Sequence, residues 1–203
     1  MVQFHPGLVC VLENTVNKDE IIYLENNIKN LYTPQEGLLG GGLGELDKTI
    51  RKSQIHFLTP DAPNSKDFYA HVESLAWKIA NQANRTVYGF NLEYLDGLQY
   101  TEYHAEDEGF YDWHHDWCYN AGSPHFHRKL SFTIQLSEEN EYVGGNLEFS
   151  DFECAPKLMK NLPSMSKQGT TIIFPSFMQH RVSPVKQGIR KSLVAWFAGE
   201  RLR

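Results

Sequence analysis

The feature that most constrains the fold is a series of short β-prone segments that begins after Gly89 and continues almost to the end of the chain. Turn-forming sequences such as Asp-Glu-Gly, Ala-Gly-Ser-Pro and Lys-Gln-Gly lie between these segments. Strands of this length and spacing predict a mainly β protein of the sandwich or jelly-roll type. The segments are 92–103, 111–117, 129–136, 145–149, 169–174, 180–185 and 190–197.

The first 90 residues have a different pattern, because two stretches carry apolar residues at helical spacing. The first stretch opens at Asn17, which predicts an N-cap. The second runs from Asp67 to Arg85. Short strands are expected beside them, at 2–12 and 50–58.

No repeat and no low-complexity linker separates the two halves of the chain. We therefore expect a single domain over residues 1–203, with 1–90 as a helical support and 91–203 as a jelly-roll core. Residues 36–46, EGLLGGGLGEL, form a glycine-rich loop that lacks the ending of a phosphate-binding loop. This loop is either a lid beside a pocket or a plain flexible connection.

Charge and composition argue against several classes of function. The net charge is −6 and no block of Lys or Arg occurs, so nucleic acid is not an expected partner. No run approaches the roughly 18 apolar residues of a membrane helix, and the first residues lack a secretory signal. The three cysteines, Cys10, Cys118 and Cys154, show no CxxC spacing. These features predict a cytoplasmic protein without a membrane partner.

Residues 113–116, WHHD, contain the strongest candidate for a metal site. On an extended strand His114 and Asp116 point to one face, whereas His115 points to the other and is not an expected ligand. His180 opens a later strand. Two imidazoles and one carboxylate form the facial triad that leaves positions open on Fe(II). The alternative reading of the first pair is a histidine that merely bonds a nearby carboxylate.

Arg190 is the candidate for binding an anionic cosubstrate. It opens the last strand, ten residues after His180. A buried guanidinium would suit a small dicarboxylate such as 2-oxoglutarate. Tyr103 could add a phenol donor beside it. The alternative reading of Arg190 is an ordinary surface arginine.

Other polar and aromatic residues are weaker candidates. Thr133 and Gln135 share one face of the segment 129–136, and this polar row either lines the barrel as cosubstrate contacts or faces solvent. His125 and His127 are expected in a loop, at a substrate or on the surface rather than at the metal. Aromatic residues near the triad either stack on a substrate, exclude water or pack in the core; they are Tyr111, Trp113, Trp117, Tyr119 and Phe126.

Ordered motifs over about residues 92–198 resemble one known family, the prolyl 4-hydroxylase-type 2-oxoglutarate/Fe(II) oxygenases, in particular its small bacterial and phage branch. Any one motif alone would be weak, but the ordered set is specific. The motifs are Leu98-Gln-Tyr-Thr-Glu-Tyr, Trp113-His-His-Asp, Arg128-Lys-Leu-Ser-Phe-Thr-Ile-Gln-Leu-Ser, Tyr142-Val-Gly-Gly-Asn-Leu-Glu-Phe, Gly169-Thr-Thr-Ile-Ile-Phe-Pro-Ser, His180-Arg-Val-Ser-Pro-Val and Gly188-Ile-Arg-Lys-Ser-Leu.

The resemblance implies a double-stranded β-helix that uses Fe(II), 2-oxoglutarate and O2, with ascorbate as a further candidate cofactor. It implies that Arg190 binds the 5-carboxylate of 2-oxoglutarate, assisted by Tyr103. Arg190 matches the arginine-bearing members of the family, because collagen-type enzymes of animals have lysine there. The segment Asn146-Leu-Glu departs from the usual pattern. The iron ligands implied are His114, Asp116 and His180.

The implied reaction is hydroxylation of an unactivated C–H bond, with a peptidyl proline as the leading substrate. A free amino acid or another small molecule is the alternative substrate. The rival hypotheses are a non-catalytic, cupin-like metal-binding module and a metal enzyme that uses no 2-oxoglutarate. Because ligand histidines must be neutral, activity is expected to fall as the pH drops toward about 6.5.

Overall fold

The computed structural model describes residues 2–4, 8–37, 47–117, 126–150 and 163–200. The glycine-rich stretch 38–46 and the candidates His125 and Tyr119 lie outside these residues. The helices are α1 (Lys18–Leu31) and α2 (Lys66–Ala83), with a π-helical turn (Asn84–Tyr88) and short 3-10 turns (Ala105–Asp107 and Pro163–Ser166). The strands are β1 (Val2–Phe4), β2 (Cys10–Leu12), β3 (Gln35–Glu36), β4 (Arg51–Lys52), β5 (Gln54–Leu58), β6 (Tyr94–His104), β7 (Phe110–His114), β8 (Phe126–Gln135), β9 (Tyr142–Gly144), β10 (Leu147–Phe149), β11 (Thr171–Pro175), β12 (His180–Val182) and β13 (Val185–Glu200).

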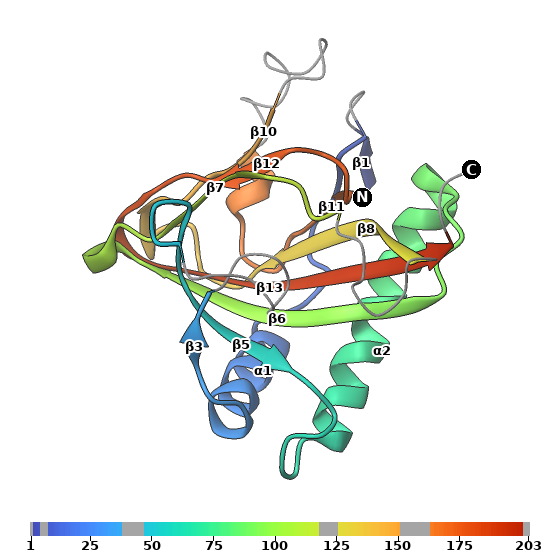
Figure 1. Cartoon of the computed structure of the whole chain (residues 1–203), viewed down its shortest axis with the longest axis horizontal. Coiled ribbons are helices and arrows are strands. Elements are labelled where there is room, and N and C mark those ends of the chain that lie inside the picture. Colours follow the sequence, from blue (N-terminus) through green and yellow to red (C-terminus); the bar gives the residue numbers. More distant parts are fainter. Residues whose placement is uncertain (1, 5–7, 38–46, 118–125, 151–162, 201–203) are drawn as a thin grey trace.

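Two antiparallel sheets are formed by the described strands. The larger sheet has the order β1-β2-β11-β8-β13-β6-β5-β3, with β9 attached to β13, and the smaller sheet has the order β10-β12-β7-β4. Figure 1 shows the smaller sheet on one side of the larger sheet and the two long helices on the other. The fold is therefore a mainly β jelly roll with N-terminal supporting helices, as the sequence predicts.

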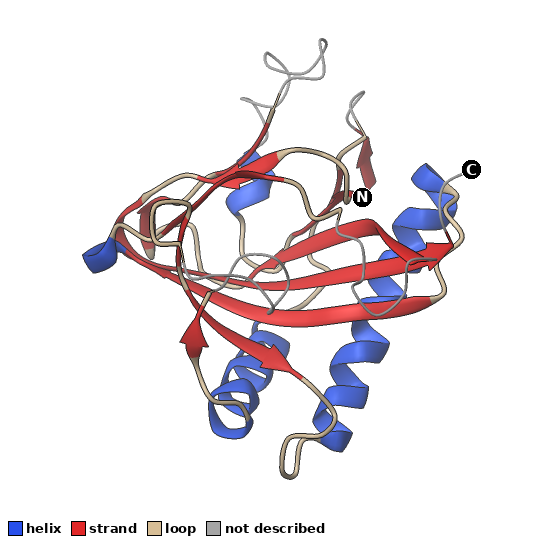
Figure 2. Cartoon of the chain, in the orientation of Figure 1, coloured by secondary structure: helices blue, strands red, loops and turns tan. Residues whose placement is uncertain are grey.

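The two long helices bury their apolar stripes against the larger sheet (Figure 2). The predicted cap of α1 is confirmed, because the side-chain oxygen of Asn17 accepts a hydrogen bond from the backbone N–H of Glu20 at 2.8 Å. Ile21, Leu24 and Ile28 are buried at the spacing of one helical face. Among the described residues, no helix is both long and apolar enough to span a bilayer.

The larger sheet has one apolar face and one polar face. On β8, Leu130 and Ile134 belong to the core under the helices, whereas Ser131, Thr133 and Gln135 point to the opposite side. All five of these residues are buried. The polar row predicted on this strand therefore lines the interior between the two sheets and does not face solvent.

Candidate active site

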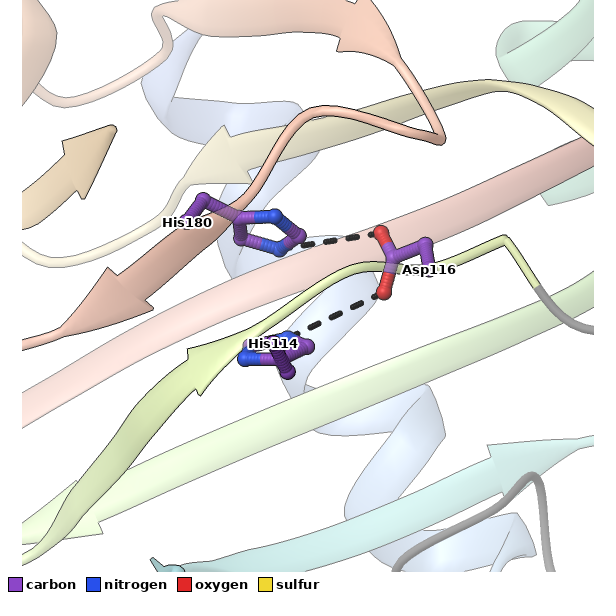
Figure 3. Close-up of side chains that lie close together, drawn as sticks. All are labelled: His114, Asp116 and His180. Carbon is purple, nitrogen blue, oxygen red and sulfur yellow. Dashed lines mark ion pairs between the residues drawn. The ribbon is translucent and has the colours of Figure 1, made fainter. Parts of the chain in front are cut away.

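Three side chains from neighbouring segments of the smaller sheet converge between the two sheets (Figure 3). His114 ends β7 and His180 opens β12, and the two residues are paired in the ladder. The Nε2 atoms of His114 and His180 lie 3.8 and 3.7 Å from Oδ1 and Oδ2 of Asp116. One ligand atom from each residue lies within 4.8 Å of the others. The structure thus brings together the three residues that the sequence predicts as metal ligands.

The route by which Asp116 reaches this point differs from the prediction. The segment 111–117 was expected to be one strand, but β7 ends at His114. Asp116 lies in the irregular segment that follows, where its backbone N–H donates to the carbonyl oxygen of Ser176 at 2.9 Å. A hydrogen bond to the turn that follows β11, and not strand alternation, therefore places the carboxylate beside the imidazoles.

Backbone carbonyl groups fix the tautomer of both histidines. Nδ1 of His114 lies 2.7 Å from the carbonyl oxygen of Asp112, and Nδ1 of His180 lies 3.0 Å from that of Met178. A carbonyl oxygen can only accept a hydrogen bond, so Nδ1 carries the proton in both neutral rings. Each Nε2 then presents a lone pair toward the carboxylate of Asp116. Lone pairs that converge without a proton between them fit a bound cation.

The protonation states of His114 and Asp116 also suit a cation. Burial, and then the neighbouring His180, lower the pKa of His114 to about 4. Burial alone would raise the pKa of Asp116, but the two imidazoles and Arg128 bring it below its ordinary value. For His114, the loss of activity expected at about pH 6.5 from an unperturbed histidine therefore moves to lower pH.

A cavity of about 120 Å³ lies next to these three residues, between the two sheets. Arg190 reaches it from β13 and is 3% exposed. Its Nη1 lies 3.5 Å from Oγ of Ser192, its guanidinium carbon lies 5.7 Å from the centroid of the Tyr103 ring, and it makes no ion pair with any described carboxylate. A buried cation of this kind fits an anionic ligand. Other residues that line the cavity include Arg51, Gln99, Thr101, Tyr103, Thr133, Ser192, Val194 and Trp196.

Of the other residues predicted to contact the cosubstrate, Tyr103 and Thr133 line the cavity and Gln135 does not. Burial raises the pKa of Tyr103, so its phenol is a neutral hydrogen-bond donor at the cavity wall. Thr133 also lines the cavity, whereas Gln135 lies outside the set of described lining residues. The amide of Gln135 donates to the phenol oxygen of Tyr142 at 2.9 Å. A role of Gln135 in binding the cosubstrate stays a prediction.

For the surrounding residues, one expectation is wrong and one of the alternatives left open is excluded. His127 was expected in a loop, but it is buried within β8, 5.6 Å from the ring of Trp117. Core packing of Trp113 is excluded, because it is 37% exposed and packs against the guanidinium of Arg181. Trp117 is 41% exposed. Both tryptophans therefore lie at the surface, and neither is among the described residues that line the cavity.

Several cavity residues were missed by sequence reasoning. Gln99 donates to the hydroxyl oxygen of Thr101 at 2.7 Å, and both residues alternate with the buried Leu98 and Tyr100 on β6. That alternation is a signal that could have identified them. Arg51 carries no such signal, because its place depends on the pairing of β4 with β7.

Asp96 on β6, Arg128 on β8 and Trp196 on β13 form a connected group of side chains at the cavity wall. Nε of Arg128 lies 2.5 Å from Oδ2 of Asp96, and its guanidinium carbon lies 4.3 Å from the ring centroid of Trp196. The indole N–H of Trp196 is buried and has no acceptor among the described residues. This unit presents an aromatic surface and an unused donor beside the triad.

Fold and site together define a jelly-roll protein whose His-Asp-His cluster fits a single metal ion. The model of the 2OG-Fe(II) oxygenase superfamily matches residues 98–198 of the chain. This stretch contains all three residues of the cluster and Arg190. The chain belongs to this superfamily.

Curated relatives and solved structures agree with this assignment. The chain is 37% identical over 92 residues to a PKHD-type hydroxylase of Synechococcus sp. (strain CC9311), covering 45% of this chain and 38% of that protein. It is 28% identical over 128 residues to a PKHD-type hydroxylase of Crocosphaera subtropica, covering 62% of this chain and 54% of that protein. The chain thus spans about half or less of the length of these relatives.

Two solved structures share the fold at low sequence identity. A prolyl-4-hydroxylase of Pseudomonas putida superposes with a TM-score of 0.61 at 18% identity and covers 98% of this chain and 95% of that one. A prolyl hydroxylase of Trichoplax adhaerens, solved with a hypoxia inducible factor peptide fragment, superposes with a TM-score of 0.68 at 15% identity. It covers 95% of this chain and 84% of that one.

Proposed function

We propose that this protein is an Fe(II)- and 2-oxoglutarate-dependent hydroxylase in which His114, Asp116 and His180 bind the iron. The observation that carries the proposal is the convergence of two Nε2 lone pairs and one carboxylate within 4.8 Å, beside a buried arginine. The iron, once loaded with 2-oxoglutarate and O2, supplies the oxidation that converts a C–H bond to C–OH, with succinate and CO2 as the other products. A single domain over residues 1–203 and a cytoplasmic location are part of this proposal.

In this proposal the residues of the larger sheet bind and orient the cosubstrate. Arg190 neutralises the 5-carboxylate of 2-oxoglutarate, which explains a guanidinium buried without a carboxylate among the described residues. Tyr103 donates its phenol proton to the same carboxylate, and Thr133 contacts the chain of the cosubstrate. Gln135 acts indirectly by holding Tyr142. Ascorbate would serve as a reductant delivered from solution.

A peptidyl proline is the proposed substrate. The cavity has a volume of only about 120 Å³, so most of a peptide substrate must lie outside it. Trp196 offers an apolar face for a pyrrolidine ring and an indole donor for a nearby carbonyl group. The prolyl hydroxylases among the structural relatives support the same class of substrate.

The proposal is tested by succinate release from the purified chain with Fe(II) and 2-oxoglutarate. Proline-containing peptides, the same peptides with alanine in place of proline, and free amino acids are the three arms. We expect succinate in proportion to hydroxylated peptide in the first arm, with background in the second. Turnover of free amino acids alone would assign the alternative substrate class. Tight metal binding without succinate in any arm would favour a non-catalytic binding module.

A further inference from the structure

Tyr111 packs face to face against one residue of the proposed metal site. The centroid of its ring lies 3.5 Å from that of the His114 imidazole, and the two ring planes are inclined by 12°. This is a parallel stack at van der Waals contact. The proposed function gives Tyr111 no role, so the reason for this contact has to be found in the strand that carries both residues.

A β-bulge produces the stack. Residues three apart on a regular strand point to opposite faces, so Tyr111 and His114 would not touch. In the ladder between β7 and β12, His180 is the partner of His114 and Val182 is the partner of Tyr111. β7 therefore has one residue more than β12 in this interval. The extra residue turns both rings toward the cavity, which is a common use of bulges near functional sites.

Arg51 fixes the ring of Tyr111 in turn. It is the ladder partner of Tyr111, and its guanidinium carbon lies 4.6 Å from the ring centroid. Nε of Arg51 donates to Oγ of Ser53 at 2.7 Å. A Cβ atom at Gly37 would lie 2.5 Å from Nε of Arg51, so a larger residue there would displace the arginine. Tyr111 is thus packed against a fixed cation as well as against the imidazole.

His114 needs this support more than His180 does. The side chain of His180 is 7% exposed and contacts the ring of Phe174 at a centroid distance of 4.6 Å. That of His114 is 16% exposed. The hydrogen bond to the carbonyl of Asp112 fixes one atom of the His114 ring but leaves the ring free to tilt about it. The stacked ring of Tyr111 defines the plane.

We propose that Tyr111 is a positioning residue of the metal site, which fixes the plane in which His114 presents Nε2. The bulge in β7 and the contact with Arg51 hold Tyr111 in that role. The inference rests on the proposed function, because it requires that the triad binds a divalent metal. Tyr111 acts through the flat face of its ring, so an aromatic ring is required at position 111 but the phenol hydroxyl is not.

The test is a Co(II) titration of the metal-free chain, in which binding is monitored by the visible d–d absorption of the bound ion. Co(II) is a stand-in for Fe(II) that does not oxidise readily and whose bands report coordination geometry. The variants are Tyr111→Phe, which keeps the ring, Tyr111→Leu, which keeps apolar volume without it, and Arg51→Met. The matched control is Tyr32→Leu, which removes a buried tyrosine far from the site, whose hydroxyl bonds the carbonyl of Thr59.

We expect Tyr111→Leu to weaken Co(II) binding about tenfold and to change the d–d bands, as for residues that orient a metal ligand. Tyr111→Phe should stay within about twofold of the parent chain, and Arg51→Met should be intermediate. Tyr32→Leu should lower the melting temperature without changing the affinity or the bands. If Tyr111→Leu fails to fold, an unchanged affinity and spectrum of Arg51→Met overturns the inference.

Two failures are distinguishable. If the parent chain binds Co(II) and the folded Tyr111→Leu variant binds it equally well with the same bands, the positioning role is wrong and the proposed function stands. If the parent chain itself does not bind Co(II), the proposed metal site is wrong and the inference falls with it.

Discussion

The helix side and the cavity side of the larger sheet are built from alternate residues of the same strands. On the helix side, Leu98, Leu130 and Leu193 pack into the core against α1 and α2. On the cavity side, Thr133 and Ser192 are buried just as deeply, yet they are polar. Apolar burial stabilises a fold by about 25 cal/mol per Å², whereas a buried polar group needs a partner to break even. The helix side therefore supplies stability, and the cavity side is maintained for binding.

Buried charges differ between the two sides in the same way. Glu102 on the helix side accepts from Tyr100 at 2.6 Å and pairs with Lys29 and His104 at 2.9 and 3.0 Å. Arg190 on the cavity side has no carboxylate partner among the described residues and lies 3.5 Å from Ser192. A satisfied charge indicates a structural role, whereas an unsatisfied one indicates a place for a ligand.

The largest expected effect is that of Asp116→Ala on the cavity side. Loss of the carboxylate leaves two neutral imidazoles, which bind a divalent metal weakly, so 2-oxoglutarate turnover should fall at least about a thousandfold. The melting temperature of the metal-free chain should stay within a few degrees, because the loss of the hydrogen bond from Ser131 is offset by the removal of a buried carboxylate. Succinate release and circular dichroism check the two parts. Full activity of this variant would show that the metal ligands are misassigned.

The next largest effect is expected for Arg190→Gln. A charge-assisted pair in a buried site contributes about 2–5 kcal/mol, so the KM for 2-oxoglutarate should rise about a hundredfold. Removal of a buried cation should leave the stability unchanged or higher. Initial rates at varied 2-oxoglutarate concentration measure the change. A KM equal to that of the parent chain would show that Arg190 does not bind the 5-carboxylate of 2-oxoglutarate.

Leu130→Ala should lower the stability of the fold and leave cosubstrate binding unchanged, which is the opposite of the two changes above. Truncation of a fully buried leucine on the helix side should lower the free energy of unfolding by about 3 kcal/mol and leave the KM for 2-oxoglutarate unaltered. Thr133→Val, three positions along the same strand but on the cavity side, is the matched control. It should change stability by less than about 0.5 kcal/mol and raise the KM a few fold. Urea unfolding and initial rates separate the two faces.

The smallest expected effect is the pH-dependent contribution of Glu102, on the helix side, to the free energy of unfolding. Burial alone would raise the pKa of Glu102, but its hydrogen bonds from Tyr100, Lys29 and His104 lower it below its ordinary value. A carboxyl with a lowered folded-state pKa stabilises the fold above its unfolded pKa of about 4.3, and that contribution is lost as the pH falls below it. Glu102→Gln should therefore cost about 1–2 kcal/mol at pH 7 and less near pH 3. Urea unfolding at both pH values tests this.

The sequence predicts the elements of the fold well because local patterns determine them. Asn17 and the apolar stripe of α1 are readable one turn at a time, and the alternation along β8 assigns Thr133 to the face opposite Ile134. The three proposed metal ligands were found because their residue types are distinctive. The alternation argument for Asp116 was wrong, since the residue lies beyond the end of β7.

What the sequence did not predict depends on pairing between strands. Arg51 reaches the cavity because β4 joins β7, and Tyr111 reaches His114 because β7 is bulged against β12. Neither event leaves a periodic trace in the residues themselves. For Arg190 the sequence left a buried and a surface position open, and its place in β13 shows that it is buried.

Because of the extra residue in β7, the site depends on the number of residues between Tyr111 and His114 as well as on the identity of its side chains. Asp112 joins this strand to its surroundings through its backbone, with its N–H donating to the carbonyl of Ile50 and its own carbonyl oxygen accepting from His114. Substitution there keeps both bonds, whereas deletion would restore regular alternation and rotate Tyr111 out of the cavity. In related chains, the spacing between positions 111 and 114 should therefore vary less than the identity of residue 112.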